Sequence, residues 1–112
     1  MTTIALAIHG GCGVLPLDSM STEDWAVARQ DLARALAAGW AELAGGGSAV
    51  AAVEAAVVVM EDSPHFNAGH GAALNEDGIH ELDASIMDGA TLEAGAVSAA
   101  RASATRCARR GR

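Results

Sequence analysis

The sequence of 112 residues contains no lysine and no tyrosine, and its only aromatic residues are Trp25, Trp40 and Phe66. Although 51% of the residues are hydrophobic, most of these are Ala and Val. Ala fills little volume, so the chain gains less burial per residue than its hydrophobic fraction suggests. The length and composition predict one globular domain with a small core.

Cysteine and long apolar runs are also scarce. Cys12 and Cys107 are the only cysteines and lie far apart, which argues against a disulfide framework. No basic segment precedes the short apolar stretch at the N-terminus, so we expect no secretory signal. The longest apolar run, 49–60, is interrupted by Glu54 and is too short to span a bilayer. These features predict a cytoplasmic protein that does not enter a membrane.

Positive charge is almost confined to the end of the chain. The net charge is −7, and residues 1–100 carry fourteen acidic residues against two arginines, while residues 101–112 carry five arginines. An acidic body disfavours nucleic acid and anionic membranes as partners. The basic segment contains no aromatic residue and is therefore only a weak signal for nucleic-acid binding.

The periodicity of the chain predicts an α+β fold with the order strand, helix, helix, strand, strand. Residues 3–9 are apolar on both faces, as in a central strand. Capping patterns at Ser21 and Ser48 predict helices that end at the glycines 45–47 and near Asp62. An alternating pattern predicts a strand at 79–86. After a turn at 88–89, a segment of small residues, 91–99, is predicted to form another strand.

The two predicted helices differ in how they should be buried. The second helix is apolar nearly all round, which is typical of a helix between two layers. The first has apolar residues every three or four positions along one face, a pattern typical of a core-facing side. These residues are Trp25, Ala28, Leu32, Leu36, Trp40 and Leu43.

Several catalytic or binding patterns can be weighed from the residues alone. The loop H-G-G-C-G at 9–13 resembles a phosphate-binding turn, but Pro16 stands where a dinucleotide fingerprint needs glycine, and the chain has no P-loop lysine. Cys12 has no basic neighbour in sequence to lower its pKa, so a packing role is favoured over a nucleophilic one. Thr2 would become an N-terminal threonine if Met1 were removed, but no polar constellation in the sequence serves it.

A transition-metal site is a further alternative, because His65, His70 and His80 lie near Glu81 and Asp83. Their spacing does not match helical or knuckle zinc sites, and histidines packed in loops or exposed to solvent are the simpler interpretation.

Five segments in order carry a family resemblance. They are H-G-G-x-G at 9–13, G-G-S-A-V-x-A-V-E-A-A-V at 46–57, E-D-S-P-H-F-N-A-G-H-G-A at 61–72, E-L-D-A-S-I-M-D-G at 81–89 and T-L-x-A-G-A-V at 91–97. Across residues 4–99 the chain resembles the isoaspartyl peptidases and plant-type asparaginases. The resemblance implies part of the α-subunit of an αββα sandwich of the N-terminal-nucleophile hydrolase class, here incomplete.

The resemblance also implies a chemistry. Such precursors cut themselves, and the new N-terminal threonine of the β-subunit attacks L-asparagine or a β-aspartyl dipeptide, with its own amine as base. The intact enzyme is expected to be a dimer of αβ units. None of the threonines in this sequence lies in the matching motif, so no catalytic residue is assigned and the chain alone is expected to be inactive.

Some site residues can still be carried over by position. Asn67 is expected to line the catalytic pocket, and the backbone of Gly10 and Gly11 is expected to approach the nucleophile. The segment 60–70 resembles a loop whose main-chain carbonyls bind a structural sodium ion, and no cofactor is expected for the chemistry itself. The corresponding carbonyls belong to Met60, Glu61, Ser63, Phe66, Ala68 and His70.

The chain departs from the family pattern after Ala100. Residues 1–100 form the predicted partial α-subunit, and 101–112 form an Arg/Ala-rich tail, for which a shifted reading frame is one hypothesis. A different class of function also stays open, in which the chain is a non-catalytic subunit that pairs with a separately encoded β-subunit.

Overall fold

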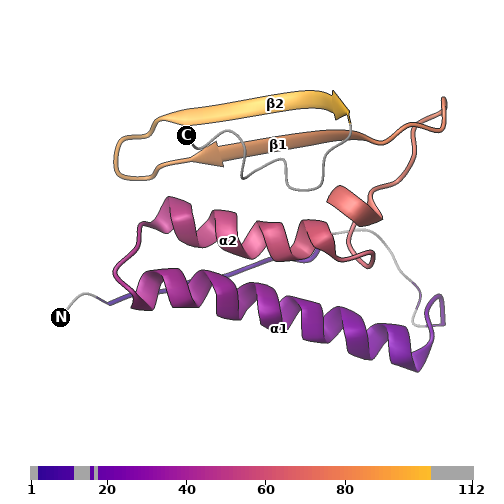
Figure 1. The fold of residues 1–112 in the computed structure, drawn as a ribbon, viewed down its shortest axis with the longest axis horizontal. Helices are drawn as coiled ribbons and strands as arrows, with labels where there is room; N and C mark the ends of the chain where they lie inside the picture. Colours follow the sequence, from indigo (N-terminus) through magenta and orange to yellow (C-terminus); the bar gives the residue numbers. More distant parts are fainter. Residues whose placement is uncertain (1–2, 12–15, 17, 102–112) are drawn as a thin grey trace.

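In a computed structural model, residues 3–11, 16 and 18–101 are described. The predictions that concern Thr2, Cys12, Cys107 and the tail from 102 onward lie outside these residues. The described elements are α1 (Thr22–Ala44), α2 (Ala49–Asp62), the short 3-10 helix η1 (Gly69–Gly71), β1 (Glu81–Met87) and β2 (Ala94–Arg101). Along the molecule the β1–β2 hairpin, α2 and α1 follow one another, with α2 between the hairpin and α1 (Figure 1).

Both helices begin and end where the sequence predicts. The Ser21 side chain accepts a hydrogen bond from the Asp24 amide at 3.0 Å, and the Ser48 side chain accepts one from the Ala51 amide at 3.1 Å. These bonds satisfy amides that have no partner within the first helical turn. At the other end of α2, Ser63 is the C-cap and Pro64 follows it.

Small residues form the contact between α1 and α2. Ala35 and Ala52 are fully buried, and a Cβ added at Gly39 would lie 2.8 Å from the Ala52 carbonyl oxygen. The helices therefore approach closely, and larger side chains are displaced to the flanks. The predicted core-facing side of α1 is wrong in this respect, because Leu36 and Trp40 are 41% and 45% exposed. The buried residues of α1 are Ala28, Asp31, Ala35 and Gly39.

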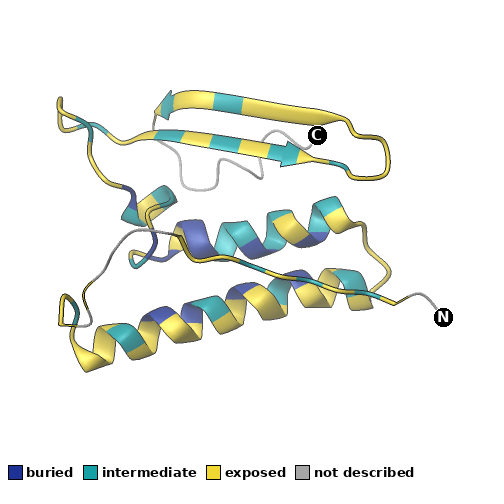
Figure 2. Ribbon diagram, turned by 180° about the vertical axis from the view of Figure 1, so that it is seen from behind, coloured by how far each residue is buried: buried dark blue, intermediate teal, exposed yellow. Residues whose placement is uncertain are grey.

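The N-terminal segment 3–9 is not the strand that the sequence predicts. Its residues alternate between partly buried Ile4, Leu6 and Ile8 and exposed positions between them, as in a strand with one covered face. Figure 2 shows the segment running along the helix pair. Among the described residues the only sheet consists of β1 and β2, and this segment, which lies along the helix pair, is not part of it. Its backbone periodicity is local, whereas a strand requires a partner.

Strands β1 and β2 form an antiparallel hairpin. β1 covers Glu81–Met87 where 79–86 was predicted, and β2 covers Ala94–Arg101 where 91–99 was predicted. The Asp88 side chain accepts a hydrogen bond from the Ala90 amide, and the Asp88 amide donates to the Glu93 carbonyl, which closes the expected turn. The register shifts between Leu82 and Ala84, where the Asp83 carboxylate accepts a hydrogen bond from the Ala99 amide at 2.9 Å. This irregularity is a β-bulge held by a side chain.

The buried hydrophobic cluster is small, as the composition predicts. Ala35, Met60 and Phe66 form it, and Ile8 and Leu32 are packed against it. It therefore joins both helices, the N-terminal segment and the loop after α2. No helix within the described ranges is long and apolar enough to cross a bilayer.

Candidate functional site

The loop Ser63–Ala73 carries most of the predicted site residues, and Phe66 anchors it. Phe66 is 7% exposed and belongs to the buried cluster with Ala35 and Met60. A Cβ added at Gly10 would lie 3.3 Å from the Phe66 ring and 3.4 Å from Leu32. Because Gly10 has no side chain, the end of the N-terminal segment can lie against Phe66, the residue that precedes Asn67 in the loop.

Two glycines allow the loop to fold back onto the end of α2. Gly69 has a φ of 52°, and a Cβ there would overlap the Glu61 carbonyl oxygen and lie 2.7 Å from the Glu61 Cβ. A Cβ at Gly71 would overlap the Phe66 carbonyl oxygen and lie 2.6 Å from that of Pro64. The backbone of η1 therefore lies directly against a series of main-chain carbonyl groups.

The Asn67 side chain closes this loop from within. Its Oδ1 accepts a hydrogen bond from the Ala73 amide at 2.9 Å. Asn67 lines a hollow of about 420 Å³ between the loop and the start of β1, together with Glu61, Glu81 and Asp83. The loop and the start of the hairpin are separate in sequence, and the structure places Asn67 in a hollow that both segments line.

The predicted glycine pair, Gly10 and Gly11, lies near the loop that carries Asn67 but does not line the same hollow. Gly10 contacts the loop through the Phe66 ring, but neither Gly10 nor Gly11 belongs to the lining of the Asn67 hollow. Gly11 has a φ of 117°, which a residue with a side chain rarely adopts, and its amide donates to His9 Nδ1 at 3.0 Å. The two glycines therefore lie beside the loop, and a Cβ added at Gly11 would meet no atom within 4 Å.

A buried polar pair joins the loop to α1. The Ser63 hydroxyl donates to Asp31 Oδ2 at 2.5 Å, and Asp31 Oδ1 accepts from Arg34 at 2.5 Å. The hydrogen bond from Ser63, followed by the charge of Arg34, holds the pKa of Asp31 below its usual value although burial opposes this shift. Asp31 is therefore a carboxylate at neutral pH, and it is bound on both oxygens.

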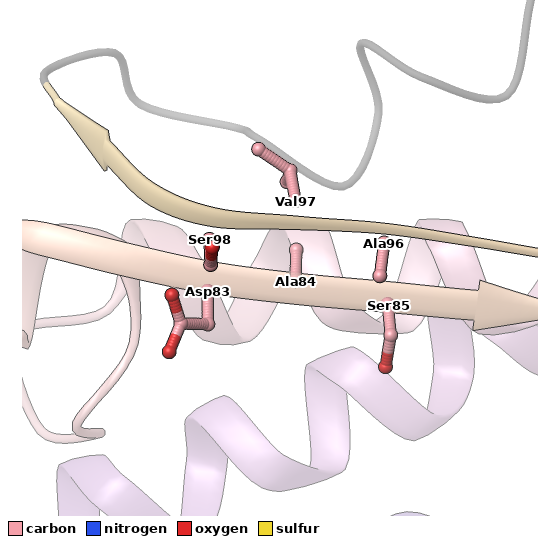
Figure 3. A pocket seen from close by; sticks show the side chains of 6 residues that line it. All are labelled: Asp83, Ala84, Ser85, Ala96, Val97 and Ser98. Carbon is pink, nitrogen blue, oxygen red and sulfur yellow. The ribbon is translucent and has the colours of Figure 1, made fainter.

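A second hollow, of about 440 Å³, lies along the hairpin. Its lining consists of Asp83, Ala84, Ser85, Ala96, Val97 and Ser98. Figure 3 shows Asp83 and Ser85 pointing to one side of the hairpin, and Ala84 and Val97 to the other. The polar and apolar faces that the alternating sequence predicts for β1 are thus separated.

Near the hairpin, Glu81 is held by two neighbours. A hydrogen bond from Asn75, followed by one from Arg101, keeps the pKa of Glu81 below its usual value. In the part of the chain that the structure describes, no group of three or more His, Cys, Asp or Glu side chains is arranged to hold a metal ion.

Comparison with known proteins gives the family. A family model described as asparaginase matches residues 2–108. The chain belongs to the asparaginase family. It is 51% identical over 94 residues, 84% of the chain, to the isoaspartyl peptidase/L-asparaginase of Homo sapiens. It is 48% identical over 99 residues, 88% of the chain, to that of Mus musculus, and 45% identical over 98 residues, again 88%, to the isoaspartyl peptidase of Salmonella typhimurium.

This asparaginase-family chain spans about 30% of the length of the curated relatives it matches, with 29% of the human and mouse proteins and 31% of the Salmonella protein covered. The match confirms the family to which the sequence motifs point. It identifies the chain with a family of hydrolases. The roles of single residues in this chain are a separate matter and are proposed below.

One polar residue of this asparaginase-family chain was not predicted from its sequence. By residue type alone, the sequence gives no reason to single out Asp31, because an acidic residue on a helix is normally exposed. A signal was present, since Asp31 lies three residues after Ala28 and four before Ala35, on the side of α1 that is buried. Its partner Ser63 was predicted only as a carbonyl ligand, and its hydroxyl was given no role.

Proposed function

We propose that the chain provides the first part of an isoaspartyl peptidase/L-asparaginase, an amide hydrolase that acts on L-asparagine and β-aspartyl dipeptides. The observation that carries the proposal is the fixed position of Asn67, which is held by Ala73 in a loop that the core anchors. The family match and the printed names of the relatives support the choice of reaction. We place the protein in the cytoplasm.

In this proposal the nucleophile is a threonine of a β-subunit, in an αββα sandwich that the described residues only begin. The threonine amine takes the hydroxyl proton while the threonine oxygen attacks the side-chain amide carbon of the substrate. The C–N bond then breaks, the proton passes to the departing ammonia or amino acid, and water hydrolyses the acyl-threonine ester to release aspartate. Asn67 lines the pocket, and Gly10 and Gly11 leave room for the nucleophile. The N-terminal segment, whose backbone has no strand partner among the described residues, would pair with strands of the β-subunit. Two αβ units would form the active dimer.

A sodium ion fits the loop by the chemistry of its donors. Sodium takes hard oxygen ligands. The glycines at 69 and 71 let the backbone of η1 lie close to the carbonyl oxygens of Glu61 and Phe66, so main-chain oxygens are gathered at the loop. The Met60 and Ala68 carbonyls accept hydrogen bonds from the amides of Ser63 and Gly71, which orients them. We propose that the ion is held by the carbonyls of Met60, Glu61, Ser63, Phe66, Ala68 and His70.

A hybrid protein tests the proposed reaction. Residues 1–100 of this chain would replace the matching segment of the Salmonella isoaspartyl peptidase, which is 45% identical to it. We expect the hybrid precursor to cleave itself and then to release ammonia from L-asparagine. Asn67→Ala should lower kcat/KM by about 10- to 100-fold, because the pocket loses a side chain that is held in position. Gly95→Ala is the control, since a Cβ there meets nothing within 4 Å. A matured hybrid that hydrolyses neither substrate would refute the proposal.

The second candidate is a non-catalytic subunit that pairs with a separately encoded β-subunit. The small core and the unpaired N-terminal segment favour a chain that needs a partner. A neighbouring gene that encodes a threonine after glycine, in a family-like context, would support this candidate. The tail 101–112 stays a separate predicted segment in both.

A further inference from the structure

We propose that Asp31 is a positioning residue, which acts through Ser63 to hold the Ser63–Ala73 loop and with it Asn67. This inference rests on the proposed function for its catalytic meaning. Its structural part stands on one hydrogen bond between residues 32 positions apart, which joins the middle of α1 to the loop after α2.

The burial of the pair makes the bond strong and obligatory. The Asp31 side chain is 6% exposed and Ser63 is 3% exposed. A carboxylate in such a place is stable only when its oxygens are bound, and a hydrogen bond to an ionised acceptor is about twice as strong as one between neutral groups. Arg34, which binds the other oxygen, is 68% exposed. Ser63 is thus the buried partner, and the bond to it is shielded from water.

The bond fixes more than one position of the loop. The Ser63 hydroxyl donates to Asp31 and accepts from the His65 amide at 3.2 Å, and the Ser63 amide donates to the Met60 carbonyl. The Ser63 hydroxyl therefore links the His65 amide, in the residue before Phe66, to Asp31, while the Ser63 amide keeps the chain on the last turn of α2. Asn67 follows Phe66 directly, so the direction in which the chain leaves Ser63 determines where Asn67 lies.

The alternative is that Asp31 and Ser63 only help α1 pack against α2. The two explanations differ in where the loss of the bond is felt. A packing role loosens both helices, because their contact at Ala35, Gly39 and Ala52 is shared. A positioning role loosens residues 65–73 and leaves the helix contact protected.

Amide hydrogen exchange on the 112-residue chain separates these explanations. We expect Ser63→Ala and Asp31→Ala to accelerate exchange at residues 65–73 by about 10- to 100-fold. Asp31→Asn keeps an acceptor without the charge, so its effect should be smaller. The double variant Ser63→Ala with Asp31→Ala should add little to either single change, because both remove the same bond. Arg34→Gln is the control that removes only the exposed partner, and loop exchange should stay unchanged.

If amide exchange accelerates equally in the loop and in α1 and α2, or does not accelerate in the loop, the proposal is overturned. Asp31→Asn still allows this comparison if Ser63→Ala or Asp31→Ala unfolds the chain. In the hybrid enzyme, Ser63→Ala should lower kcat more than it changes KM, and unchanged kcat would contradict the positioning role. An inactive parent hybrid with a loosened loop in the variants would sink the proposed hydrolase function while supporting the link between Asp31 and the loop.

Discussion

Replacing Gly39 by alanine is expected to destabilise the chain by about 1–3 kcal/mol, because the added methyl group overpacks the contact between the helices. The new Cβ would lie 2.7 Å from Leu6 Cδ2 and 2.8 Å from the Ala52 carbonyl oxygen. Leu6 can rotate away, but the carbonyl belongs to the backbone of α2, so the helices have to separate. Alanine normally favours a helix over glycine by about 1 kcal/mol, so a net loss would show that the contact outweighs propensity.

Urea unfolding followed by circular dichroism measures this loss. Gly95→Ala is the matched control, since no atom lies within 4 Å of its added Cβ. Its midpoint should equal or exceed that of the parent chain. An unchanged or higher midpoint for Gly39→Ala would mean that α1 and α2 do not pack as closely as described.

Replacing Gly71 by alanine should disrupt the loop while the helix pair persists. The added methyl group would overlap the Phe66 carbonyl oxygen and lie 2.6 Å from that of Pro64, and neither oxygen can move without moving the backbone. We expect a loss of about 1–3 kcal/mol. The hydrogen bond from the Ala73 amide to Asn67 should also be lost, because Gly71 lies between these residues.

The same variant tests the proposed cation. The parent chain should melt at a higher temperature in sodium chloride than in choline chloride of equal concentration, because an ion that binds only the folded state stabilises it. Gly71→Ala should remove this difference, whereas Gly95→Ala should keep it. Equal melting temperatures of the parent chain in the two salts would contradict the sodium site.

The sequence predicted the features that depend on neighbours along the chain. The caps Ser21 and Ser48, the glycines after α1, and the turn at Asp88 each act within four residues, and each is found as expected. The role of Asn67 is predicted from the family resemblance of the F-N-A-G motif, and the periodicity of the chain does not indicate it. The structure adds that its side chain closes the loop on Ala73.

The features that the sequence did not predict depend on contacts between distant segments. Segment 3–9 has the composition of a strand, but a strand needs a paired neighbour, and among the described residues β1 and β2 pair only with each other. On α1, the apolar periodicity suggested which face is buried. The close approach of α1 to α2 favours small residues at the contact, so Leu36 and Trp40 are exposed. Asp31 is buried because Ser63, which is 32 residues away, provides a donor.

Ammonia release from L-asparagine by the purified 112-residue chain tests the central claim most directly. The claim of the proposed function is that this chain holds the loop that carries Asn67, whereas the threonine that attacks the amide lies in a β-subunit. We predict no release above the uncatalysed rate, for the parent chain and for Thr2→Ala alike. Turnover by the parent chain that disappears in Thr2→Ala would contradict the account, because the chain would then contain its own nucleophile.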